Sequence, residues 1–127
     1  MVAEVIEAVE KKDINKLKSL IGEGFSLDKF DGNASALIRA CDEGYTEIAI
    51  TLIDSGADIN YEDDAGDSPL ICAAVIGNVS IVEKLLTKSV NVNNINRLGA
   101  SALGYAKHHG KDEVVKLLEE FGAFDDE

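Results

Sequence analysis

The sequence predicts an all-α solenoid of four helix-turn-helix units connected by β-finger loops. Serines that precede apolar runs recur every 33 residues, glycines recur with the same step, and the apolar positions after each glycine have helical spacing. The serines are Ser35, Ser68 and Ser101, and the glycines are Gly44, Gly77 and Gly110. A repeat of this length is typical of stacked units that bury their apolar faces only against neighbours.

The 127 residues are predicted to form one repeat domain, a size that allows a hydrophobic core. The expected units are about 1–29, 30–62, 63–95 and 96–127, and the expected fingers are 27–34, 58–67 and 91–100. Two fingers carry a glycine suited to left-handed backbone, Gly66 and Gly99. Asn33 takes the corresponding place in the first finger, and asparagine also tolerates that conformation.

The first and last units are predicted to be caps, because a terminal unit has a neighbour on one side only. The first unit keeps apolar residues at helical spacing, and its other positions are charged. In the last unit, Lys107 stands where the other units have small or apolar residues. Phe121 and Phe124 are expected to seal the exposed end. The apolar positions of the first unit are Val5, Ala8, Val9, Leu17, Leu20 and Ile21.

The two middle units have clear helix boundaries. Ser35 and Ser68 are expected to N-cap first helices, and proline follows Ser68 where its missing N–H costs nothing. A second helix is expected from about Thr46 to Asp54, with glycine ending it. Ser89 replaces that glycine in the third unit, so its turn is expected to differ. The third unit's buried stripe is Ile81, Val82, Leu85 and Leu86.

The two cysteines, Cys41 and Cys72, fall on equivalent helices of neighbouring units. A disulfide needs Cα atoms within about 7 Å, whereas packed helices lie about 8–10 Å apart. We therefore expect two buried free thiols.

The repeated unit resembles the ankyrin repeat. The run Ser68-Pro69-Leu70-Ile71-Cys72-Ala73-Ala74 is similar to the family's T-P-L-H-x-A motif, and Gly56-Ala57-Asp58-Ile59-Asn60 is similar to its G-A-D-V-N motif. The resemblance covers nearly the whole chain and depends on four units in register. It implies a rigid, non-enzymatic protein-binding surface made of finger tips and first helices on a concave face.

Charge and composition exclude several classes of function. Twelve Lys and Arg against twenty-four Asp and Glu give a net charge of -12, which opposes binding to nucleic acid or an anionic membrane. The same charge would attract a basic protein, although it could instead serve solubility alone. No apolar run approaches a membrane span, and the N-terminus does not resemble a signal peptide. A cytoplasmic protein is expected.

No cofactor, metal site or catalytic set is predicted. His108 and His109 are adjacent on a helix and point about 100° apart, so sharing one metal ion is difficult. The acidic second finger lacks the spacing of a calcium loop, and no histidine lies nearby in the sequence to complete a catalytic set. No phosphate-binding loop is present. The finger is therefore interpreted as a solvated acidic segment, or as an acidic patch that binds a partner.

The sequence predicts a protein–protein interaction module that acts as a monomeric adaptor for a basic partner. An alternative is a stoichiometric inhibitor or immunity-type protein that blocks one enzyme or toxin. Val75 and Ile76 could be an exposed interface centre or could pack beneath the fingers. The exposed positions that the resemblance implies as partner-binding are Asp31, Ala34, Asp42, Glu43, Asp64, Asp67, Val75, Ile76, Arg97, Leu98, His108 and His109.

Overall fold

The computed structural model describes residues 2–23 and 36–124 of the chain. Within these ranges it has eight helices and no named strand. The helices are α1 (Val2–Glu10), α2 (Ile14–Gly22), α3 (Ala36–Glu43), α4 (Thr46–Asp54), α5 (Pro69–Ile76), α6 (Val79–Leu86), α7 (Ala102–His108) and α8 (Asp112–Glu120). The predictions for Asp31, Asn33, Ala34, Ser35 and the first finger lie outside the described residues.

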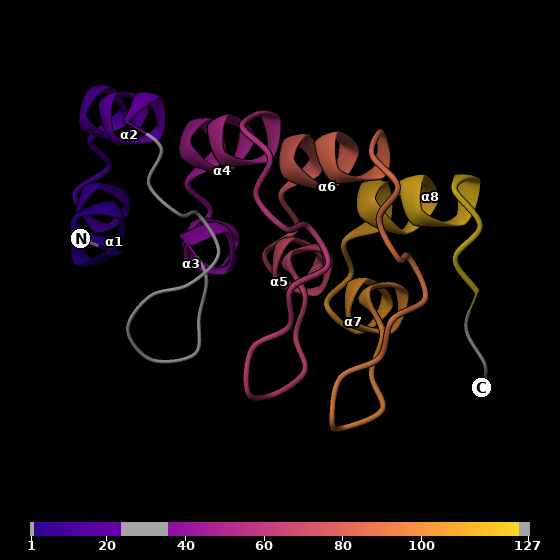
Figure 1. Cartoon of the computed structure of the whole chain (residues 1–127). Coiled ribbons are helices and arrows are strands. Elements are labelled where there is room, and N and C mark those ends of the chain that lie inside the picture. The colour runs from indigo at the N-terminus through magenta and orange to yellow at the C-terminus, as the bar shows by residue number, and fades with distance from the viewer. Residues whose placement is uncertain (1, 24–35, 125–127) are drawn as a thin grey trace.

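The helices form two layers (Figure 1). Helices α1, α3, α5 and α7 lie side by side in one layer, and α2, α4, α6 and α8 lie above them in the other. The second and third fingers, which we define as residues 58–67 and 91–100, extend below the first layer. The predicted all-α solenoid of helix pairs is confirmed.

Capping side chains fix where several helices begin. The Ser68 hydroxyl accepts a hydrogen bond from the backbone N–H of Ile71, and Ser101 accepts one from Gly104. Proline occupies the first position of α5, as expected. At the other end of α5, Gly77 adopts the left-handed conformation with φ of 82°.

The core runs through the stack between neighbouring pairs. Alanines such as Ala40, Ala73 and Ala106 are fully buried, which allows first helices to approach closely. Burial of each large aliphatic side chain contributes about 1.5–3 kcal/mol. The largest fully buried side chains are Val5, Val9, Leu17, Leu37, Leu52, Leu70, Ile71, Ile81, Val82, Leu85, Leu103 and Leu118.

Two turns depart from the repeated pattern. Ser89 avoids positive φ, and the Val90 N–H instead donates to the Lys88 carbonyl at 2.7 Å, so this turn differs as the missing glycine predicted. Lys12 adopts φ of 56° and is the one described non-glycine residue with positive φ. It ends α1 where the other units use glycine, a departure that sequence reasoning missed. Such backbone costs about 1–2 kcal/mol outside glycine.

The fingers are loops held by side chains more than by strand pairing. Among the described residues, one isolated antiparallel bridge joins Ile95 to Ser101. Gly66 and Gly99 have φ of 81° and 79°, as their finger positions predicted. The fingers are therefore positioned chiefly by the hydrogen bonds described below.

The C-terminal end of the stack keeps apolar surface. Phe121 and Phe124 are 46% and 62% exposed, so they cover this end only in part. The expected seal is therefore incomplete within the described residues. Lys107 is exposed.

Candidate functional site

Asn96 joins the second finger to the third and to α7. Its Nδ2 donates to the carboxylate of Asp67 at 2.8 Å and to the Tyr105 hydroxyl at 2.9 Å. Its Oδ1 accepts from the backbone N–H groups of Leu98 and Ala100. Asn96 is only 6% exposed, so the loss of these partners would leave buried polar groups unsatisfied. This one side chain fixes the fold of the third finger.

Backbone contacts also hold the two fingers together. The N–H of Arg97 donates to the carbonyl of Ala65 at 2.9 Å. A Cβ added to Gly66 would lie 3.1 Å from the Arg97 nitrogen and from the Asn96 Cα, so glycine is needed for this close approach. Asp63 tightens the second finger, because its Oδ1 accepts from the N–H groups of Ala65 and Asp67. The two fingers therefore form one braced unit.

An open groove of about 450 Å³ lies between the two fingers. Three carboxylates and one guanidinium line it together with Ile95, which is 59% exposed. We call it the finger groove, and its lining residues are Glu62, Asp63, Asp64, Gly66, Ile95, Asn96 and Arg97. It offers negative charge beside an apolar surface, which suits the head and the methylene stem of a basic side chain.

The predicted site residues on the fingers have two different roles. Asp64 and Arg97 are exposed and line the finger groove, and Leu98 is 85% exposed. Asp67 is half-buried and accepts the hydrogen bond from Asn96. Asp67 therefore has a structural role that its exposed position in the repeat did not predict.

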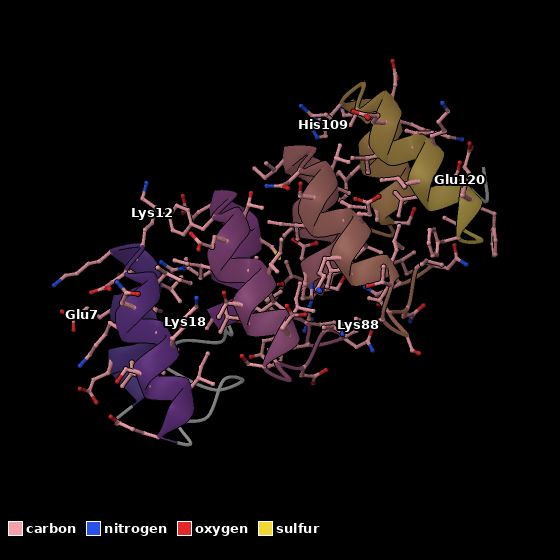
Figure 2. The ribbon with its side chains drawn as sticks, turned by 90° about the horizontal axis from the view of Figure 1, so that it is seen from above. Glu7, Lys12, Lys18, Lys88, His109 and Glu120 are labelled. Atoms are coloured by element: carbon pink, nitrogen blue, oxygen red, sulfur yellow. The ribbon has the colours of Figure 1, made fainter. Side chains whose placement is uncertain are left out.

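The other predicted residues lie at the C-terminal ends of α3, α5 and α7. We call them the helix-end row, which consists of Asp42, Glu43, Val75, Ile76, His108 and His109. Figure 2 shows Lys12 and His109, which belong to the helix-to-helix turns of the first and last pairs, at the same edge of the stack. The row therefore follows one edge, away from the finger groove.

Ile76 is exposed and Val75 is not fully exposed, which answers the question that the sequence left open. Ile76 is 44% exposed, and its Cγ2 lies 3.7 Å from where a Cβ on Gly44 would be. Its side chain therefore lies over the end of α3, beside the residue that follows Glu43. Val75 is half-buried and packs against the core.

Tyr105 connects the finger groove to the helix-end row, a role that the sequence reasoning did not identify. Its hydroxyl accepts from Asn96, and its ring stacks on His109 with centroids 6.2 Å apart. His109 in turn makes an edge contact with His108 at 5.1 Å. Tyr105 takes the repeat position that Arg39 and Cys72 take in earlier units. The appearance of an aromatic residue at this position was the signal in the sequence that could have identified it.

Charge is distributed unevenly over this surface. Exposed carboxylates concentrate at the finger groove and at the end of α3, where Asp42 and Glu43 lie. The α1 end is partly neutralised, because Glu10 pairs with Arg39 and Glu7 pairs with Lys11. At the α7 end the row carries the histidine pair instead of carboxylates. The acidic part of the site is therefore its middle, between the second and third pairs.

The thiols of Cys41 and Cys72 are free and buried, as predicted. Burial raises the pKa of both thiols well above the ordinary value of 9.0, and nearby carboxylates add to the effect. Both sulfurs are therefore protonated and poorly nucleophilic at neutral pH.

Within residues 2–23 and 36–124, no group of three His, Cys, Asp or Glu side chains could hold a metal ion. No helix in those ranges is long and apolar enough to cross a membrane.

Stacked helix pairs with projecting loops define a repeat solenoid, in which each unit is stabilised by its neighbours. A family model described as "Ankyrin repeats (3 copies)" matches residues 40–126, more than half of the chain. The chain therefore belongs to the ankyrin repeat family, as its motifs implied. Ankyrin repeats are in general protein–protein interaction modules.

The chain is similar to parts of longer proteins and spans less than two thirds of each of the three described here. A probable E3 ubiquitin-protein ligase of Oryza sativa subsp. japonica is 29% identical over 90% of this chain, which spans 24% of that protein. An ankyrin repeat and KH domain-containing protein of Caenorhabditis briggsae is 36% identical over 94% of this chain, which spans 5% of it. The putative ankyrin repeat protein YahD of Escherichia coli is 25% identical over 91% of this chain, which spans 58% of it.

Proposed function

We propose that this protein is a non-enzymatic binder of a basic partner protein, and that the finger groove and the helix-end row form its binding surface. The observation that carries the proposal is the finger groove, where Glu62, Asp63 and Asp64 lie beside Ile95 between two fingers that are braced against each other. Bracing reduces the entropy lost when a partner binds. Carboxylates beside apolar surface favour Lys or Arg, whose stems pack while their charges pair.

The proposed binder acts as a monomer in the cytoplasm. A net charge of -12 opposes self-association and close approach to nucleic acid. The free thiols of Cys41 and Cys72 fit a reducing compartment. An adaptor and an inhibitor could use the same binding surface. The identity of the partner therefore decides between these two roles.

Affinity capture with charge variants tests the proposal. The purified protein is used as bait in native lysate beside Glu62→Lys/Asp64→Lys, which reverses two groove charges. Asp67 is left unchanged because it holds Asn96. The control is Glu119→Lys/Glu120→Lys, which makes the same change of net charge on exposed residues of α8.

We expect partners that the wild-type protein and the control retain and that the groove variant loses. An enzyme among them, with its activity inhibited on binding, would favour the inhibitor role. If both variants retain the same partners, or if only strongly acidic partners are recovered, the proposed surface is wrong.

A further inference from the structure

The helix-end row contains one apolar pair between two polar pairs. The repeat places Asp42, Val75 and His108 at equivalent positions, one on each of α3, α5 and α7. Glu43, Ile76 and His109 occupy the next equivalent set. The neighbouring helix pairs fold with polar residues, Glu43 and His109, at the position of Ile76. The repeat itself therefore does not require isoleucine there.

Ile76 is held in place while remaining accessible. Its Cγ2 lies beside Gly44, 3.7 Å from where a Cβ on that glycine would be, and 44% of the residue stays exposed. The adjacent Val75 packs against the core. A partly fixed apolar residue loses little side-chain entropy on binding, which is the property of an interface anchor.

We propose that the helix-end row binds an extended segment of a partner that carries an apolar side chain near a Lys or Arg. The apolar side chain packs on Ile76, and the cation pairs with Asp42 and Glu43 at the end of α3. The inference rests on the proposed function and adds a recognition rule to it. Charge complementarity supports this occupant, because exposed carboxylates flank Ile76 on the α3 side and histidines replace them on the α7 side.

The spacing within the partner follows from the packing of the helices. Packed helices lie about 8–10 Å apart, so the backbone at Asp42 and Glu43 is about one helix spacing away from the backbone at Val75 and Ile76. An extended segment advances about 3.3 Å per residue, so this distance corresponds to about three residues. The expected recognition pattern is an apolar residue with Lys or Arg about three positions away.

Selection from a phage-displayed library of random dodecapeptides on the purified full chain tests this rule. Recovered peptides are synthesised with a fluorophore, and their affinities are measured by fluorescence anisotropy in 0.15 M salt, which screens long-range attraction. The variants are Ile76→Glu and Asp42→Asn/Glu43→Gln. Phe121→Glu is the matched control, because Phe121 is 46% exposed, close to the value for Ile76, but lies at the C-terminal end of the stack.

We expect peptides with the apolar residue and the cation about three positions apart. Their affinity should fall about tenfold or more with Ile76→Glu, the loss typical of an anchor residue. It should fall about twofold to fivefold when both carboxylates are neutralised, since exposed ion pairs are weak. Phe121→Glu should leave it unchanged, and circular dichroism should show that each variant keeps its helix content.

Several outcomes would overturn the inference. Basic peptides that bind Ile76→Glu as tightly as wild type, but lose affinity with Glu62→Lys/Asp64→Lys, would refute the helix-end rule and leave the proposed function intact. Failure to recover any peptide sensitive to either site would count against both. A concentration-dependent dimer in sedimentation that Ile76→Glu dissociates would show that a second copy of the chain covers this surface instead.

Discussion

The side-chain amide of Asn96 donates a 2.8 Å hydrogen bond to the carboxylate of Asp67, across the gap between the second and third fingers. The same amide nitrogen reaches the Tyr105 hydroxyl, and the amide oxygen caps two backbone N–H groups. Because Asn96 is buried, Asn96→Ala should lower the free energy of unfolding by about 2–4 kcal/mol. Urea denaturation followed by circular dichroism measures this loss.

Tyr105→Phe is the control for that prediction. It removes only the hydroxyl, and the Asn96 amide keeps Asp67 and both backbone donors. The expected loss is about 0.5–1.5 kcal/mol. Equal losses for Asn96→Ala and Tyr105→Phe would show that the fingers are not held chiefly by the Asn96 side chain.

Gly66→Ala and Gly99→Ala should differ, although both residues have nearly the same backbone conformation. Their φ values are 81° and 79°, so each alanine should cost about 1–2 kcal/mol in backbone strain. Only the Cβ at position 66 would crowd the opposing finger, at 3.1 Å from backbone atoms, whereas position 99 has open space. Thermal or urea unfolding should therefore show the larger loss for Gly66→Ala. A larger loss for Gly99→Ala would contradict the close contact between fingers.

The two thiols should be protected from thiol–disulfide exchange while the protein is folded. Cys41 and Cys72 are buried, and their raised pKa keeps them in the unreactive thiol form. At pH 8, Ellman's reagent should modify both slowly in buffer and immediately in denaturant. Rapid modification of either thiol in the folded protein would show that its helix opens readily.

Stability should fall at alkaline pH because of the same thiols. In the unfolded chain they ionise near the ordinary value of 9.0, whereas in the folded chain they stay protonated. Above that pH the unfolded state binds fewer protons, so rising pH favours unfolding by about 1.4 kcal/mol per pH unit for each thiol. A Cys41→Ala/Cys72→Ala variant should have a shallower decline in urea midpoints between pH 9 and 10.5. Parallel declines in the two proteins would refute this assignment.

The sequence was sufficient to predict the repeat architecture, because the 33-residue step of serines and glycines is a local signal. It predicted the range of α4 and the altered turn at Ser89 for the same reason. The contacts between units were harder to predict. Asn96 takes the repeat position of Asp63, and both side chains cap the equivalent two N–H groups of their fingers. The bonds from the Asn96 amide to Asp67 and Tyr105 have no such repeated counterpart, and they depend on how the fingers and α7 approach in space. The exposure of Ile76 was also undetermined, because an apolar residue at the end of a helix suits a core as well as an interface.

Amide hydrogen exchange of the protein with and without a partner recovered by capture tests the central claim most directly. Binding should slow exchange around the second and third fingers and at the ends of α3 and α5, including Asp42, Asp64 and Ile76. Exchange in the outer helices α4 and α6 should change little. Protection confined to α4, α6 and α8, with the fingers unchanged, would show that the partner binds the opposite face and would contradict the proposed binding surface.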